Sequence, residues 1–198
     1  GTSVLALDAR RLAARGARSD AVYLLTRELE RHGDTSIYER LQKNIHLLNL
    51  VGTPAPALDA PEFLGAGRAS IASMKGSPLV LFFWAHWCGD CKAQGPILEK
   101  LQAEFAGSGL RIIAPTQRFG YAASARTPAT PEEERAHILT VRERSYPFLE
   151  NVPIPLSEQN FKRYGVSSTP TLVLVDRNGS VRLYHPGRMP EETLRSAL

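Results

Sequence analysis

The sequence contains only two cysteines among its 198 residues, Cys88 and Cys91. So few thiols exclude a disulfide-stapled scaffold and leave a four-cysteine zinc site without ligands. The chain also lacks an apolar run of the roughly 20 residues that a membrane-spanning helix needs. Residues 1–15 are rich in Ala and Arg and lack the apolar core of a signal peptide. These absences indicate a globular protein whose cysteine pair serves chemistry.

Charge of one sign is not concentrated anywhere along the chain. The formal net charge is +4 and the sequence pI is about 9.3, with basic and acidic residues interspersed. A nucleic-acid-binding domain would show a basic stripe interleaved with exposed aromatic residues. We therefore expect no nucleic-acid partner, and we interpret the charge as a solvated surface.

The two cysteines lie one helical turn apart, in Cys88-Gly89-Asp90-Cys91. An apolar run over 79–84 precedes them and a helical pattern follows, so a strand delivers Cys88 to the first turn of a helix. Unpaired N–H groups and the helix dipole favour a thiolate there, and a thiolate attacks disulfides. Cys91 can then resolve the mixed disulfide. We interpret the pair as a redox dithiol, because a structural disulfide across four residues would constrain very little chain.

Residues 1–50 predict a helical extension. They contain almost no Gly or Pro, and apolar residues recur at helical spacing in two stripes, which predict a helical hairpin with a further short helix in 4–15. Ser36-x-x-Glu39 predicts a capping box for the later helix, and His32-Gly33-Asp34 predicts the end of the earlier one. One hairpin cannot bury its own apolar face, so we expect it to dock on the rest of the chain or on a partner.

Residues 51–198 predict an α/β sandwich around a mixed sheet, entered through the Pro-rich segment 51–56. Asn178-Gly179 predicts a tight hairpin, and Thr130-Pro131-x-Glu133 predicts a capped helix start. We expect a loop over 117–130. The remaining expected elements are strands at 68–73, 79–85, 111–116, 171–176 and 180–185, and helices at 89–106, 131–145, 157–164 and 190–197.

With these motifs in place, the chain resembles the thioredoxin superfamily, and most of all its TlpA/ResA-like branch of thiol:disulfide oxidoreductases (redoxins). The resemblance covers residues 51–198, including an insertion that holds the helix at 131–145, and it leaves residues 1–50 outside. It implies a thioredoxin-like mixed sheet flanked by helices. The matching segments are the run from Phe83 to Cys91, Pro96 in the following helix, Thr169-Pro170, the lead-in from Val51 to Pro56, and the loop from Met74 to Pro78.

The resemblance also implies roles for residues around the dithiol. Pro170 is expected to form a cis peptide bond beside it, and Thr169 to offer backbone groups to an extended substrate. Trp87 adjoins the first cysteine, where an exposed indole would make an apolar platform for a protein substrate. Gln117 and Arg118 follow a strand at the same sheet edge and are candidates for substrate binding, with a plain loop as the alternative.

Two positions depart from the family pattern. The buried acid six residues before the first cysteine is Phe82 here, and a Glu three residues after the second is Gln94. The usual proton acceptor for Cys91 is therefore missing. Asp90 lies between the cysteines, where its charge should raise the pKa of Cys88 while the helix terminus lowers it. We expect Asp90 and Gln94 to tune the dithiol, with Asp90 making it more reducing.

Other polar residues receive structural interpretations. His86 could act as a ligand or base, but a solvent-facing histidine is the favoured interpretation. The charged residues of 132–144 are assigned to a solvated helix face. Trp84 is assigned to the core because strand alternation points it away from Trp87.

These residues predict a thiol:disulfide oxidoreductase that reduces protein disulfides, with Cys88 as nucleophile and Cys91 as the resolving thiol. No cofactor beyond the redox-active disulfide and no metal is expected. The expected partners are protein disulfide or thiol substrates and a membrane or periplasmic electron donor. The resemblance implies an extracytoplasmic setting such as cytochrome c maturation. Because Gly1 stands in place of an initiator Met, we expect that a signal or anchor was removed; a cytoplasmic location is the alternative.

Three other functions compete with this prediction. A disulfide-donating oxidase or a thiol peroxidase could use the same fold, although neither the residues before Cys88 nor Asp90 favours them. A Cu(I)-binding chaperone would use both cysteines and a third ligand from His86, His137 or His185.

Overall fold

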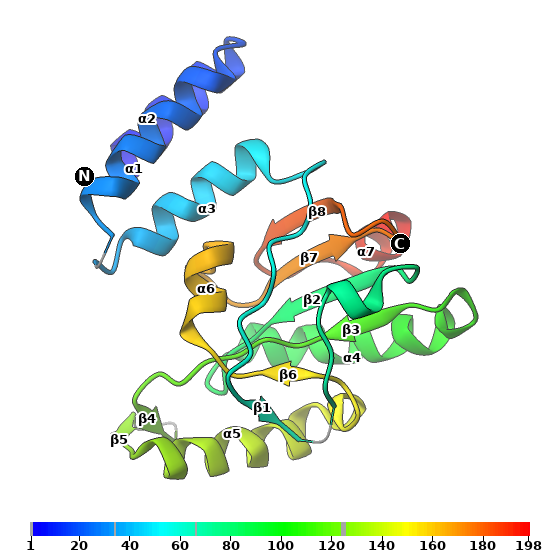
Figure 1. The fold of residues 1–198 in the computed structure, drawn as a ribbon. Helices are drawn as coiled ribbons and strands as arrows, with labels where there is room; N and C mark the ends of the chain where they lie inside the picture. Colours follow the sequence, from blue (N-terminus) through cyan, green and yellow to red (C-terminus); the bar gives the residue numbers. More distant parts are fainter. Residues whose placement is uncertain (1, 34, 66, 124–125) are drawn as a thin grey trace.

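The computed structural model describes residues 2–33, 35–65, 67–123 and 126–198, and it places a mixed sheet at the centre of the molecule (Figure 1). The four-stranded sheet has the order β3-β2-β7-β8. Strand β2 pairs parallel with β3 and antiparallel with β7, which also pairs antiparallel with β8. The predicted α/β architecture is confirmed. The strands are β2 (Leu79–Phe83), β3 (Arg111–Ile113), β7 (Thr171–Val175) and β8 (Val181–Pro186).

Strand β2 is buried along its whole length because helices cover both faces of the sheet. Val80 and Phe82 point into one core with Leu98 of helix α4 (Gly89–Glu104). Leu81 and Phe83 point into the opposite core, which is shared with helix α6 (Glu158–Tyr164). This two-sided burial explains why β2 is a continuous apolar run rather than an alternating one. The helix α7 (Glu191–Ala197) contributes Leu194 to the first core.

An insertion after β3 carries helix α5 (Pro131–Ser145), whose bounds match the predicted helix. The predicted capping box is present: Thr130 Oγ1 accepts from the Glu133 N–H at 3.3 Å, and the Glu133 carboxylate accepts from the Thr130 N–H at 2.8 Å. The segment expected to be a loop contains a small hairpin of β4 (Tyr121–Ala122) and β5 (Thr127–Pro128). The hairpin and α5 lie together at one end of the molecule (Figure 1).

The strand predicted at 68–73 is wrong. Ser70 and Ser73 exchange side-chain-to-backbone hydrogen bonds of 3.0 and 3.1 Å, and these compete with a sheet ladder. A 3₁₀ turn, η1 (Ala72–Met74), forms instead. Two further 3₁₀ turns are η2 (Ala106–Ser108) and η3 (Pro147–Leu149). The sequence pattern did not predict two short strands, β1 (Phe63–Leu64) and β6 (Ile154–Pro155), which pair antiparallel with each other.

The N-terminal extension consists of α1 (Thr2–Ala14), α2 (Arg18–Arg31) and α3 (Tyr38–Asn49), which share an apolar cluster centred on Leu25 and Leu41. Helix α2 ends before His32 as predicted, and Asp34 lies outside the described residues. The capping box at Ser36 is wrong, because a turn in which the Tyr38 N–H donates to the Thr35 carbonyl leads directly into α3. Across the described residues, no helix combines the length and apolar character needed to cross a membrane.

Helix α3 attaches the extension to the rest of the chain through α6. His46 is buried, and its Nε2 lies 2.8 Å from the Arg163 carbonyl at the end of α6. Burial lowers the pKa of His46, so the ring is neutral at pH 7 and can donate to that carbonyl. The following chain also pairs with β8: the Gly52 N–H donates to the Val181 carbonyl at 2.8 Å. The extension is thus fixed to the sheet domain at two places.

Gly165 permits the close approach of α3 to α6. Its φ of +60° closes α6 in the left-handed conformation, and a Cβ there would lie 2.3 Å from the Lys43 backbone nitrogen. At Gly109 φ is +77° as well, but a Cβ would meet only the Ser77 hydroxyl at an ordinary 3.7 Å. A substitution at Gly109 therefore introduces backbone strain alone, whereas one at Gly165 introduces the same strain and a steric conflict with α3.

We predict that Gly165→Ala destabilises the protein more than Gly109→Ala. Both pay the left-handed penalty of about 1–2 kcal/mol, and only Gly165→Ala must also displace α3. The free energy of unfolding in urea should fall by about 1 kcal/mol or more beyond the control. Equal losses for the two variants would contradict the close packing of α3 on α6.

Candidate active site

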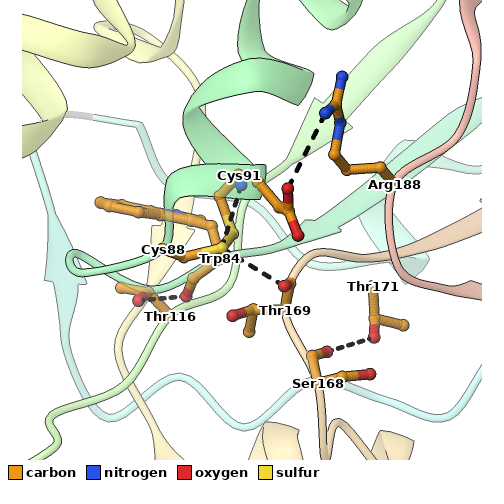
Figure 2. Close-up of a disulfide and its surroundings, with 9 residues drawn as sticks. Trp84, Cys88, Cys91, Thr116, Ser168, Thr169, Thr171 and Arg188 are labelled. Atoms are coloured by element: carbon orange, nitrogen blue, oxygen red, sulfur yellow. Dashed lines mark hydrogen bonds and ion pairs between the residues drawn. A yellow bond between two sulfur atoms is a disulfide. The ribbon is translucent and has the colours of Figure 1, made fainter.

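The dithiol lies where β2 ends and α4 begins. Cys88 is the N-cap of α4, and its Sγ accepts a hydrogen bond from the Cys91 N–H at 3.0 Å. The two cysteines form a disulfide with their Cα atoms 5.2 Å apart (Figure 2). Cys91 is fully buried, whereas Cys88 retains 3% exposure. A thiolate at Cys88 would be stabilised by this N–H and by the helix dipole.

The segment before β7 lies directly against Cys88. The Thr169–Pro170 peptide bond is cis, as the family resemblance implied. The Thr169 carbonyl oxygen lies 3.3 Å from Cys88 Sγ, and Figure 2 shows it pointing at that sulfur. In the reduced protein the Cys88 thiol can donate to this oxygen. The backbone at Thr169 is therefore placed beside the reacting sulfur.

Two buried hydrogen bonds hold the floor of the site. The Trp84 indole N–H donates to the Ala114 carbonyl at 3.1 Å. The Thr116 hydroxyl donates to the Trp84 carbonyl at 2.8 Å (Figure 2). Both join the segment after β2 to the segment after β3. Trp84 is completely buried, as predicted, and the strand end that carries Cys88 is held in a fixed position.

Trp87 is exposed beside the dithiol. Its side chain is 44% exposed, and its ring contacts Phe119 edge-on with the centroids 5.4 Å apart. An indole held in this way offers a rigid apolar surface next to Cys88. Its role in substrate binding stays a prediction.

The two expected tuning residues lie in different environments. Asp90 is exposed, with its Oδ1 3.9 Å from Arg188 Nη1. Gln94 is fully buried, and its side-chain amide makes two hydrogen bonds to the backbone of Met189. Its Nε2 donates to the Met189 carbonyl at 3.2 Å, and its Oε1 accepts from the Met189 N–H at 2.8 Å. Gln94 therefore fixes the loop that positions Arg188 opposite Asp90.

Gln117 and Arg118 follow β3, as predicted, but the Arg118 guanidinium is bonded away from the dithiol. It pairs with Glu62 at 2.8 Å and donates to the Pro131 carbonyl at 3.2 Å. Burial acts against ionisation of Glu62, yet the guanidiniums of Arg118 and Arg135 hold its pKa below the usual range. Arg118 thus ties the insertion to the segment before β1. Gln117 is half-buried, and substrate binding by either residue stays a prediction.

The prediction of a solvent-facing His86 is wrong, because the insertion covers it. His86 is 2% exposed, and its ring lies 5.0–5.6 Å from the rings of Phe119, Tyr121 and His137. Its Nε2 lies 3.4 Å from Glu134 Oε1. Burial and the neighbouring His137 lower the pKa of His86, against the opposite effect of Glu134. The ring is therefore neutral at pH 7.

Glu134 is a buried acid that the sequence analysis assigned to a solvated helix face, and that assignment is wrong. Its side chain is 1% exposed, and its two oxygens accept from the backbone N–H groups of Phe119 at 2.5 Å and Gly120 at 2.9 Å. The signal was its spacing of one helical turn from Ile138, which places both on the buried face of α5. Glu134 holds the start of the β4–β5 hairpin against α5.

Within residues 2–33, 35–65, 67–123 and 126–198, no three His, Cys, Asp or Glu side chains are arranged to hold a metal ion. The Cu(I) alternative needs a histidine beside the two cysteines, and this geometry does not supply it.

Comparison with known proteins identifies the family. The family model described as a thioredoxin-like domain matches residues 68–198. The chain belongs to the thioredoxin-like family. It is 28% identical over 144 residues to the thioredoxin-like protein YneN of Bacillus subtilis (strain 168), covering 70% of this chain and 76% of that protein. It is 25% identical over 150 residues to the thiol-disulfide oxidoreductase ResA of Geobacillus thermodenitrificans (strain NG80-2), covering 75% and 76%.

The fold also matches solved structures. A thiol:disulfide interchange protein of the thioredoxin family from Chlorobium tepidum TLS superposes with a TM-score of 0.57 at 18% identity, covering 73% of this chain and 92% of that one. The resemblance inferred from the motifs is confirmed, and the protein is an oxidoreductase of the thiol:disulfide class.

We predict that Gln94→Leu destabilises the protein by about 2–4 kcal/mol, because the buried N–H and C=O of Met189 lose their partners. Gln102→Leu, at a half-buried position on the same helix, is the control and should change the unfolding free energy by less than about 0.5 kcal/mol. Denaturant unfolding of the oxidised protein measures both. Similar values for the two variants would show that Gln94 does not hold the Met189 loop.

Proposed function

We propose that the protein reduces disulfides in protein substrates through the Cys88–Cys91 dithiol. The observation that carries the proposal is the position of Cys88 Sγ, at the N-terminus of α4 and 3.3 Å from the Thr169 carbonyl. The helix terminus stabilises the attacking thiolate, and the backbone beside it offers an edge along which an extended peptide can pair. Relatives named thiol-disulfide oxidoreductase support the same class of reaction.

The reaction proceeds by two exchanges. The Cys88 thiolate attacks one sulfur of the substrate disulfide, whose S–S bond breaks and releases the first substrate thiolate, which is then protonated. Cys91 loses its proton and attacks Cys88 Sγ, which breaks the mixed disulfide and releases the second substrate thiol. Two electrons pass to the substrate, and the protein is left with the Cys88–Cys91 disulfide. A donor dithiol must then reduce that disulfide.

Substrate contact is assigned to the residues that flank Cys88. Trp87 offers apolar surface on one side, and the Thr169–Pro170 segment offers backbone groups on the other. Gln117 follows β3 at the same edge of the sheet and is a further candidate. Arg118 is a candidate as well, with its guanidinium held by Glu62 and the Pro131 carbonyl.

The cellular setting follows the family resemblance. Relatives named ResA and DsbE support an extracytoplasmic location and a membrane or periplasmic electron donor. In that setting, apocytochromes c awaiting haem attachment are a suitable class of protein substrate. A donor in the cytoplasm would be the corresponding reductant if the protein remained there.

We predict a reduction potential for the Cys88–Cys91 couple near that of thioredoxin, about −270 mV. A dithiol that reduces other disulfides must belong to a couple with a more negative reduction potential than theirs. Equilibration with dithiothreitol, followed by thiol alkylation and mass measurement, gives the value. A potential near −120 mV would instead support the disulfide-donating alternative.

Single-cysteine variants test which cysteine attacks the substrate disulfide. Cys91→Ser should accumulate a mixed disulfide between Cys88 and a substrate protein, since the resolving thiol is gone. Cys88→Ser is the matched variant and should accumulate far less. The reverse pattern would reassign the nucleophile.

We predict that Asp90→Asn makes the couple more oxidising by about 10–30 mV, a two- to tenfold change in the equilibrium constant. Loss of the carboxylate removes a charge that opposes the Cys88 thiolate, although Arg188 at 3.9 Å offsets part of it. The effect should shrink as salt screens this exposed site. Glu99→Gln removes the same charge farther along α4 and is the control. An unchanged potential in Asp90→Asn would remove Asp90 as a tuning residue.

A further inference from the structure

A cavity of about 330 Å³ opens beside the dithiol and has no part in the exchange steps described above. Trp87 and Lys92, which immediately flank the cysteine pair in the sequence, both line it. The insertion supplies the opposite wall through Tyr121, Arg126 and His137. A peptide whose cysteine reaches Cys88 therefore passes within a residue or two of this cavity.

The cavity wall is cationic. Lys92 and Arg126 contribute positive charge, and none of the described residues that line the cavity is acidic. The Arg126 guanidinium lies over the Tyr121 ring at 5.5 Å, an arrangement that orients the cation without neutralising it. The nearby acid, Glu134, is 1% exposed and bonded to the backbone N–H groups of Phe119 and Gly120. The wall therefore favours an anionic group.

His86 adds a buried, unpartnered polar group to the same wall. Although its Nε2 lies 3.4 Å from Glu134, neither ring nitrogen has an aligned hydrogen-bond partner among the described residues. Buried polar atoms are normally bonded, and each one that is not calls for a ligand, water or functional explanation. The groups that face His86 are Glu134 and His137 from α5, Lys92 from α4 and Tyr121 from β4.

We propose that this cavity binds a carboxylate side chain of the protein substrate, close in sequence to the cysteine that Cys88 attacks. The inference rests on the proposed function, because it names a feature of the substrate for the same dithiol. Lys92 and Arg126 attract the carboxylate, and His86, whose ring nitrogens are buried without an aligned partner among the described residues, lines the same cavity. Acidic residues flanking a substrate cysteine would thereby increase its affinity for the site.

The test uses the oxidised full chain and two peptides in which serine replaces the cysteine, so that no exchange can occur. One peptide has Glu on both sides of the serine within three residues, and the other has Gln at the same positions. At low ionic strength we expect the Glu peptide to bind about fivefold or more tightly, measured by Trp fluorescence and by NMR. The imidazole signals of His86 and His137 should shift with the Glu peptide.

Matched variants locate the effect. Lys92→Gln combined with Arg126→Gln should bring the Glu-to-Gln preference close to one. The control, Lys75→Gln combined with Arg111→Gln, removes the same charge at the opposite end of the sheet and should retain the preference. Lys75 lies beside Gly179 of the β7–β8 hairpin, and Arg111 begins β3, whereas Cys88 follows the far end of β2.

Two results would overturn the proposal: equal binding of the two peptides, or a preference that survives in the cavity variant. Failure of the proposed function would appear elsewhere. It would be seen as no reduction of a protein disulfide by the dithiol, in an assay that does not depend on the serine peptides.

Discussion

The burial of β2 on both faces is the constraint on which the site depends. Helices cover each side of the sheet, so alternate side chains of β2 enter two separate cores. The strand cannot shift by one residue without exchanging these two sets of side chains. Cys88 follows this strand directly and begins α4, whose first turn supplies the N–H that its sulfur accepts. The position of Cys88 is thus set by packing far from solvent.

The insertion after β3 changes the surroundings of the dithiol. Its hairpin and helix α5 bury His86 and form one wall of the cationic cavity. Glu134 holds the hairpin by accepting two backbone N–H groups. Cys88 and Cys91 lie at the junction of β2 and α4, whereas one wall of the cavity that we propose to bind substrate comes from the insertion.

The N-terminal helices are joined to the domain by specific contacts rather than by apolar burial alone. Neutral His46 can donate to the end of α6, and Gly165 leaves room for the α3 backbone. The Pro-rich connection pairs with β8 instead of running free. This attachment lies beside α6 and β8, while α5 and the β4–β5 hairpin of the insertion lie at the other end of the molecule (Figure 1).

Local pattern alone was sufficient to place the cysteine pair at a strand-to-helix junction, and to predict the strands that carry and flank it and the capped helix α5. Each of these is encoded by contiguous residues: an apolar run, Cys-x-x-Cys at helical spacing, Asn178-Gly179 at a hairpin, and Thr130 with Glu133 at a cap. Only the tertiary structure decided that His86 and Glu134 are buried, that Gln94 serves the Met189 backbone, and that Arg118 pairs with Glu62. Those outcomes depend on contacts between residues 48 to 95 positions apart, or on burial by the insertion, and the periodicity of neighbouring residues cannot predict such contacts.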